Sequence, residues 1–241
     1  MMQYAFDIGG SKIEFGVFDD AGDILSHSKT PTPAHDRDAF VAAVSGLIDE
    51  ADGEFGERPN IGISFAGGLD PQTGAVISAN IPAIKGWLLA VELSAILNRD
   101  VLVANDADCF ALAEARTGVA KNARTVFAII LGTGVGGGIV VDGHFIGGRS
   151  GIRGEWGHGN DVTGGLIRNG LAPVACGCGN TGCLDAWGGA RGLENIHAQI
   201  SGNRTTSFEI TDAWRIGDDH ATRSLEIYCD LVSRELALMV N

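Results

Sequence analysis

An arrangement of strand, glycine-rich turn, strand and acidic hairpin occurs twice in this sequence, and no other feature limits the possible fold as strongly. The first copy runs from Phe6 to Asp19 and reads FDIGGSKIEFGVFD. The second runs from Leu131 to Gly143, reads LGTGVGGGIVVDG, and ends in Asp-Gly, a strong signal for a two-residue hairpin turn. We therefore expect two similar half-domains whose glycine-rich turns hold one polyphosphate from both sides. Tight hairpins without a ligand are the alternative interpretation.

Strands alternate with helices after an opening meander, which predicts an α/β sheet protein. Apolar segments and period-two patterns predict strands at residues 4–8, 13–18, 24–30, 61–65, 101–104 and 125–131. Helical patterns cover residues 36–55, 88–97, 107–116 and 219–239. We place an N-terminal α/β domain at residues 1–117 and a C-terminal α/β domain at residues 118–241.

The composition and the charge exclude several classes of protein and of binding partner. The 36 glycines of the 241 residues cluster instead of recurring at every third position, so a collagen-like chain is excluded. The net charge of −13 argues against nucleic acid or an anionic membrane, since either partner would require a patch of Lys and Arg. No apolar run has the length of a membrane span, and Asp7 interrupts the N-terminus where a signal peptide would be apolar. A cytoplasmic protein is expected.

Three of the five cysteines lie close together, as Cys176, Cys178 and Cys183. Their spacing and the odd total make a disulfide framework a poor interpretation. Three thiols with the imidazole of His158 form a four-ligand set that favours a structural zinc ion, with reactive thiols as the alternative. We expect the two single cysteines, Cys109 and Cys229, to be small buried residues of helices.

Asn105 and Asp106 follow a buried strand and open a helix. A carboxylate at the C-terminal end of such a strand lies where ligands bind in open α/β sheets. Asn and Asp are also common helix N-caps, so the sequence leaves the catalytic and the capping interpretation of Asp106 open.

Backbone N–H groups in glycine-rich turns can converge on phosphate oxygens. Such donors occur in the first turn at Gly9, Gly10, Ser11 and Lys12, and in the second turn at Gly132, Thr133 and Gly134. Gly-Lys-Ser/Thr does not occur in the sequence, which excludes a Walker-type loop.

The motifs together resemble one known family. They are Asp7-Ile-Gly-Gly-Ser-Lys12, Asn105-Asp106, Leu131-Gly-Thr-Gly-Val-Gly-Gly-Gly138, Gly154-Glu-Trp-Gly-His158 and Cys176-Gly-Cys-Gly-Asn-Thr-Gly-Cys183. They occur in the order found in the ROK family of sugar kinases and span most of the chain. The resemblance implies an actin-like, ribonuclease H-like fold of two α/β domains around a cleft. It also implies a cytoplasmic enzyme that forms a homodimer.

The resemblance further implies an activity, namely phosphorylation of the 6-hydroxyl of N-acetyl-D-glucosamine by ATP, with Asp106 as general base. Glucose, N-acetylmannosamine and fructose are alternative substrates. The expected sugar contacts are Gly67, Ser78, Asn80, Asn105, Asp106, Glu155, His158 and Asp185. The expected ATP contacts are Asp7, Gly9, Gly10, Ser11, Lys12, Gly132, Thr133, Gly134, Gly136 and Gly137, with Asp7 organising Mg²⁺. The expected zinc ligands are His158, Cys176, Cys178 and Cys183.

Three departures from the family pattern qualify these expectations. Ala66-Gly67 stands where Pro-Gly is usual, and Asp185 stands where the family has Glu, which shortens the reach of that carboxylate toward the sugar. The family also continues well beyond residue 241, so a truncated form that binds sugar without catalysis, and binds ATP more weakly than a longer form, is a further alternative. A ROK transcriptional repressor is disfavoured, because the first expected strand begins at Tyr4 and the net charge is negative.

Overall fold

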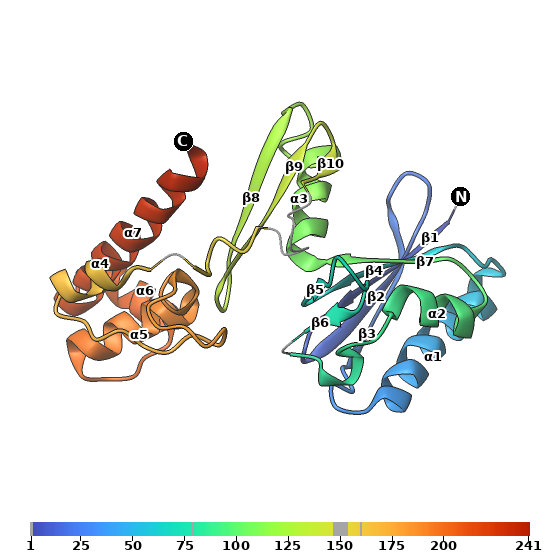
Figure 1. Cartoon of the computed structure of the whole chain (residues 1–241), viewed down its shortest axis with the longest axis horizontal. Coiled ribbons are helices and arrows are strands. Elements are labelled where there is room, and N and C mark those ends of the chain that lie inside the picture. The colour runs from blue at the N-terminus through green and yellow to red at the C-terminus, as the bar shows by residue number, and fades with distance from the viewer. Residues whose placement is uncertain (1, 79, 147–153, 160) are drawn as a thin grey trace. The chain divides into compact units, whose positions relative to one another are not determined.

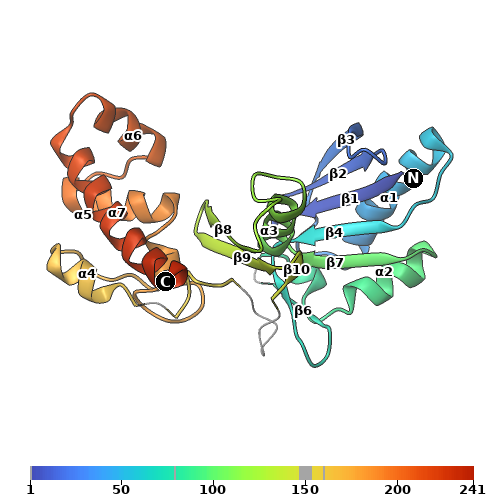
Figure 2. The same cartoon turned by 90° about the horizontal axis from the view of Figure 1, so that it is seen from above.

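A five-stranded mixed sheet organises the first part of the chain in the computed structural model, which describes residues 2–78, 80–146, 154–159 and 161–241 (Figure 1). The strands are β1 (Gln3–Ile8), β2 (Lys12–Phe18), β3 (Ile24–Pro31), β4 (Ile61–Phe65) and β7 (Val101–Asn105). Their order in the sheet is β3-β2-β1-β4-β7, which Figure 2 shows from above. β1, β4 and β7 are parallel, so their carboxyl ends lie at one edge.

One face of this sheet carries the core of the first compact unit. Along β1 the alternate residues Tyr4, Phe6 and Ile8 are buried, as a period of two requires. They belong to one apolar cluster with residues of α1 (Arg37–Phe55) and α2 (Leu89–Leu97), so both helices cover the same face. The shorter elements of this unit are β5 (Gly68–Leu69), β6 (Val76–Ile77) and the 3-10 turn η1 (Pro82–Ile84).

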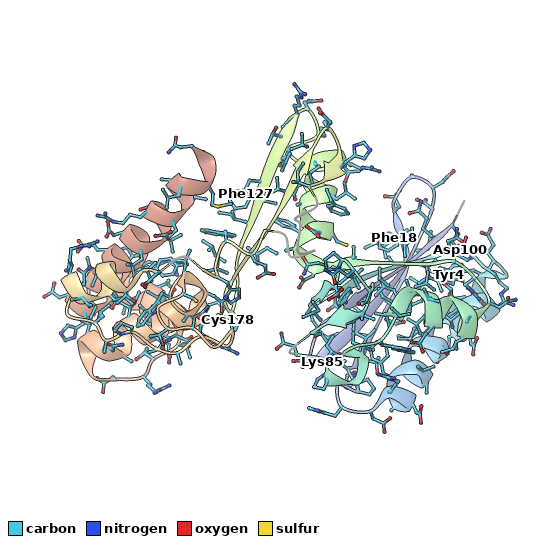
Figure 3. All side chains as sticks on the ribbon, viewed as in Figure 1. Tyr4, Phe18, Lys85, Asp100, Phe127 and Cys178 are labelled. Atoms are coloured by element: carbon cyan, nitrogen blue, oxygen red, sulfur yellow. The ribbon has the colours of Figure 1, made fainter. Side chains whose placement is uncertain are left out.

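The second compact unit combines a three-stranded antiparallel sheet with helices. The sheet has the order β10-β9-β8, and its β8–β9 pair carries the second glycine-rich turn. Trp156 packs edge-on against Phe127 of β8, which is labelled in Figure 3. The elements of this part are β8 (Thr125–Leu131), β9 (Val135–Val141), β10 (His144–Phe145), α4 (Thr163–Arg168), η2 (Leu184–Ala186), α5 (Ala190–Ser201), α6 (Ser207–Arg215) and α7 (Asp219–Val240).

The chain passes from the first unit to the second within α3 (Asp106–Arg116), where the second unit begins at Phe110, a few residues before the boundary expected after residue 117. The reason is packing. Ala111 and Ala115, on the later turns of α3, share a small apolar cluster with residues of β8 and β9, so these turns belong to the second unit.

The strands and helices expected from periodicity are confirmed, with ends that differ by at most one residue. Asp36 caps α1 by accepting the backbone N–H of Ala39, and the helix begins one residue later than the pattern suggested. Among the helices of the described residues, none combines the length and the apolar character needed to cross a lipid bilayer.

Candidate active site

The carboxyl edge of the first sheet brings together the polar residues of three strands. Residues pair in register across it, so that Asp7 of β1 lies opposite Ser64 of β4, and Ser64 lies opposite Ala104 of β7. Asn105 is the last residue of β7, and Asp106 begins α3 directly after it. This parallel edge is where ligands bind in open α/β sheets.

The structure identifies the residue that caps α3. Asn105 is the N-cap of α3, because its side-chain oxygen accepts the backbone N–H of Asp108 at 3.0 Å. Its amide nitrogen donates to the carbonyl of Gly67 at 2.7 Å and to Oδ1 of Asp106 at 2.9 Å. The Asp106 carboxylate also accepts the N–H of Ala107 at 2.9 Å. Asp106 is therefore held in one orientation by its neighbours while Asn105 caps the helix.

The environment of Asp106 suits a proton acceptor. Burial raises the pKa of its carboxyl above the usual value, and the negative charge of Asp7 raises it further. The N–H of Ala107 acts in the opposite direction and lowers the pKa. A general base works best when its pKa approaches the working pH, so the direction of the shift favours this role.

Ser64 and Cys109 interact with the candidate site residues Asp7 and Asp106, and sequence reasoning assigns neither of them to this site. The hydroxyl of Ser64 donates to Oδ1 of Asp7 at 3.2 Å, and the half-buried thiol of Cys109 interacts with Ser64. Burial raises the pKa of Cys109, and the charges of Asp108, Asp106 and Asp7 add to this effect. Pairing the strands expected at 4–8 and 61–65 in parallel would have found Ser64. The expectation that the two single cysteines are buried is wrong for Cys229, which is exposed on α7, and Cys109 is only half-buried.

The first glycine-rich turn is a tight hairpin whose polar groups are partly engaged. The N–H of Gly9 donates to the carbonyl of Lys12 at 2.9 Å, which closes the turn. The ammonium of Lys12 pairs with Glu14 at 2.5 Å, and this pairing raises its pKa. Ser11 is exposed and Gly10 lies close to Asn80. The four residues expected to contact phosphate therefore lie together at the end of β1, beside Asp7.

The residues of this unit that are expected to contact the sugar differ in their exposure and in their hydrogen bonds. Gly67 presents its carbonyl to Asn105, whereas Asn80 is exposed. Ser78 is buried, and its hydroxyl donates to the carbonyl of Ala66 at 2.8 Å and accepts the N–H of Ile81 at 3.2 Å. Ser78 thus braces the loop that follows β4.

The second glycine-rich turn joins β8 to β9. The N–H of Gly132 donates to the carbonyl of Gly134 at 3.0 Å across the turn that contains Thr133. Gly136 and Gly137 belong to β9 and pair with β8, and the indole of Trp156 donates to the carbonyl of Gly136 at 2.8 Å.

His158, Cys176, Cys178 and Cys183 form one cluster, as the sequence predicted, with all four donor atoms within 4.8 Å of one another. Cys178, labelled in Figure 3, is exposed, whereas the other two thiols are buried. The two sulfur atoms of Cys178 and Cys183 lie 3.6 Å apart, and Cys176 Sγ lies 3.5 Å from His158 Nδ1. Tetrahedral zinc with Zn–S bonds of about 2.3 Å requires ligand atoms roughly 3.7 Å apart. The donor set and its spacing therefore fit zinc.

Thiol acidity differs within this cluster. Burial raises the pKa of Cys176 to about 12, whereas a hydrogen bond from the backbone N–H of Asn180 lowers the pKa of Cys178 to about 7. His158 turns Nδ1 toward the thiols, and its Nε2 lies 3.7 Å from Oε2 of Glu155. The second ring nitrogen and the Glu155 carboxylate are therefore neighbours.

Solved structures of similar shape place the fold among the actin-like ATPases. A ROK hexokinase from Thermus thermophilus has a TM-score of 0.84 and 32% identity, and the match covers 100% of this chain and 78% of that one. A ROK family glucokinase from Streptomyces griseus, in complex with glucose and AMPPNP, has a TM-score of 0.75 and 29% identity. The match covers 99% of this chain and 79% of that one.

Sequence comparison defines the family. N-acetyl-D-glucosamine kinase from Aliivibrio salmonicida is 38% identical over 234 residues, which is 96% of this chain and 78% of that protein. The model of the ROK family matches residues 3–241. The chain belongs to the ROK family, as its motifs predicted.

Proposed function

We propose that this protein transfers the γ-phosphoryl group of ATP to the 6-hydroxyl of N-acetyl-D-glucosamine, with Asp106 as the general base. The observation that carries the proposal is the Asp106 carboxylate at the carboxyl edge of the sheet, oriented by Asn105 and with a raised pKa. The name of the Aliivibrio salmonicida relative supports the amino sugar. The complex of the Streptomyces griseus relative with glucose and AMPPNP supports a sugar and a nucleotide as ligands.

In the proposed reaction the 6-hydroxyl gives its proton to Asp106. The sugar oxygen forms a bond to the γ-phosphorus, the bond between that phosphorus and the β–γ bridging oxygen breaks, and ADP leaves. Catalysis of this kind consists mainly of positioning and neutralisation of charge. Mg²⁺ bound with ATP supplies positive charge to the phosphate oxygens, and Asp7, whose carboxylate is exposed beside the first turn, is the residue proposed to hold it.

We assign the remaining residues by their position. The turns at Gly9–Lys12 and Gly132–Gly134 are proposed to bind phosphate groups through backbone N–H donors. Glu155 and the Nε2 side of His158 are proposed to bind sugar hydroxyls, while Nδ1 of His158 and the three clustered thiols hold a structural zinc ion. The homodimer and the cytoplasmic location stay predictions. Light scattering, which measures the mass in solution, tests the homodimer.

Glucose is the second candidate substrate, because the hexokinase and glucokinase relatives are similar in structure to this chain over nearly all its length. A coupled assay of ADP release with N-acetyl-D-glucosamine, N-acetylmannosamine, glucose and fructose separates the candidates. We expect the highest kcat/KM with N-acetyl-D-glucosamine. A higher value with glucose would transfer the assignment to a hexokinase. Sugar binding by calorimetry without turnover would identify a sugar-binding protein that lacks the kinase activity.

The raised pKa of Asp106 predicts the pH dependence of the rate. The base must be ionised, so kcat/KM falls as the pH decreases through the pKa of Asp106. We expect the midpoint of this fall to lie at a pH above the usual aspartate pKa of about 3.9, because burial and the charge of Asp7 both favour the protonated form. Asp7→Asn removes one of these causes and should lower the pKa of Asp106, as an NMR titration of its carboxyl in the protein without substrate would show. An unchanged pKa of Asp106 would contradict the electrostatic coupling of the two carboxylates.

A further inference from the structure

Asp185 lies between the metal-ligand cluster and the second glycine-rich turn. It follows Cys183 by two residues, and its backbone N–H donates at 2.8 Å to the carbonyl of Gly157, the residue before His158. Its backbone is therefore tied to two segments that carry proposed metal ligands. Its side chain contacts both features, because Oδ1 accepts the N–H of Val135 at the end of the turn, at 2.9 Å, while Oδ2 lies 3.8 Å from Cys176 Sγ in the cluster.

The fit between this carboxylate and the turn is close. A Cβ atom at Gly134 would overlap Oδ1 of Asp185, so the turn approaches the carboxylate more closely than another residue type would allow. Val135, whose N–H the carboxylate accepts, is the first residue of β9 and is itself buried in the core of the unit. The hydrogen bond therefore fixes the point at which the turn ends and the strand begins.

The residues after Asp185 hold the same turn from another side. The N–H of Ala190 donates to the carbonyl of Gly132 at 2.7 Å. A Cβ atom at Gly189 would lie 2.7 to 2.8 Å from the carbonyl oxygens of Gly132, Thr133 and Gly134, so the backbone packs directly on the turn. The segment from Cys183 to Ala190 is thus a continuous connection from a proposed metal ligand to the turn.

We propose that Asp185 is a positioning residue that fastens the second glycine-rich turn to the metal-ligand cluster, so that metal bound in the cluster keeps the turn ordered. The role in nucleotide binding rests on the proposed function of the turn. Asp185 stands where sequence reasoning expects a sugar contact with a shortened reach. One of its oxygens already accepts a backbone N–H, and this bond assigns the carboxylate to the turn instead of the sugar.

Amide hydrogen exchange, measured by NMR, tests whether Asp185 holds the second glycine-rich turn in place, and it does not require an active enzyme. In Asp185→Ala the N–H of Val135 loses its acceptor, and we expect its exchange to become at least about tenfold faster. Asp185→Asn keeps an oxygen that can accept this bond and should restore slow exchange. Asp161→Ala is the matched control, because the Asp161 carboxylate also accepts a backbone N–H near the cluster, that of Thr163. Unchanged exchange at Val135 in Asp185→Ala would overturn the proposal.

Removal of the metal tests whether metal bound in the cluster keeps the turn ordered. Removing zinc with a chelator should accelerate exchange at Val135 more than at Ile227, a buried residue of α7 in the same unit. Equal acceleration at both amides would mean that metal loss unfolds the whole unit. The proposal that bound metal orders the turn would then be wrong. Should Asp185→Ala fail to fold, Asp185→Ser, whose hydroxyl is too short to reach Val135, takes its place.

Binding measurements separate the turn from the sugar. We expect Asp185→Ala to weaken binding of the non-hydrolysable analogue AMPPNP about tenfold, while the affinity for N-acetyl-D-glucosamine changes less than about threefold and zinc content stays constant. The opposite split, with sugar binding lost and AMPPNP binding kept, would make Asp185 a sugar ligand. If the unaltered protein does not bind AMPPNP, the proposed function of the turn fails, whereas the exchange experiment still decides whether Asp185 braces it.

Discussion

Asp106→Asn is expected to reduce phosphoryl transfer by a factor of about 10² to 10⁴ and to leave sugar affinity almost unchanged. The amide keeps an oxygen that accepts the N–H of Ala107 and has nearly the same volume as the carboxyl, but it cannot take the proton of the sugar hydroxyl. Steady-state kinetics and calorimetry on the same preparation measure the two effects separately.

The same substitution should not destabilise the protein at a pH where the Asp106 carboxyl is ionised. A carboxyl whose pKa is raised in the folded state stabilises the protein below its unfolded pKa, and this contribution is lost as the pH rises through the folded pKa. Wherever the carboxyl is ionised in the folded state, burial and the charge of Asp7 disfavour its charge, so removal of the charge is expected to leave the melting temperature unchanged or to raise it. A large fall in the melting temperature would show that loss of structure, and not loss of the base, explains the lost rate.

Asp38→Asn is the matched control for this experiment. Asp38 is an exposed carboxylate in the first turn of α1, as Asp106 is a carboxylate in the first turn of α3. Removal of its charge should leave turnover within a factor of two or so, since exposed first-turn carboxylates contribute only about 0.3–1 kcal/mol to stability. Near-normal turnover in Asp106→Asn would overturn the assignment of the base.

Cys178→Ser is expected to remove one zinc ion per chain and to lower the free energy of unfolding by about 4 kcal/mol. The four donor atoms come from loops on either side of α4, so the ion would cross-link segments that have little regular secondary structure of their own. Elemental analysis of the purified protein and denaturant unfolding measure the two losses. Sugar binding should weaken as well, because the same imidazole offers Nδ1 to the metal and Nε2 to the side of Glu155.

Cys229→Ser provides the control for metal loss. Cys229 is also an exposed cysteine, but it lies on α7 and is not one of the four clustered ligands. This variant should keep zinc content and stability. A protein that contains no zinc as purified, and is equally stable with Cys178 replaced, would contradict the structural role of the cluster.

Local sequence determined much of this protein. The period-two and helical patterns predicted the strands and helices, because burial on one face of an element repeats with the geometry of that element. Cys176, Cys178 and Cys183 lie so close in sequence that a shared site follows from their spacing, and Asn105-Asp106 was recognisable at the end of a buried strand. The order of the motifs was sufficient to identify the family.

Only the tertiary structure decided what these residues do to one another. Asn105 and Asp106 are equally good caps by sequence, and the hydrogen bond from the N–H of Asp108 shows that Asn105 takes this position. Ser64 meets Asp7 through the register of two parallel strands, and Asp185 accepts the N–H of a residue 50 positions away. Such hydrogen bonds depend on how separate elements pack. Local propensity and periodicity describe each element alone, so they carry no information about these contacts.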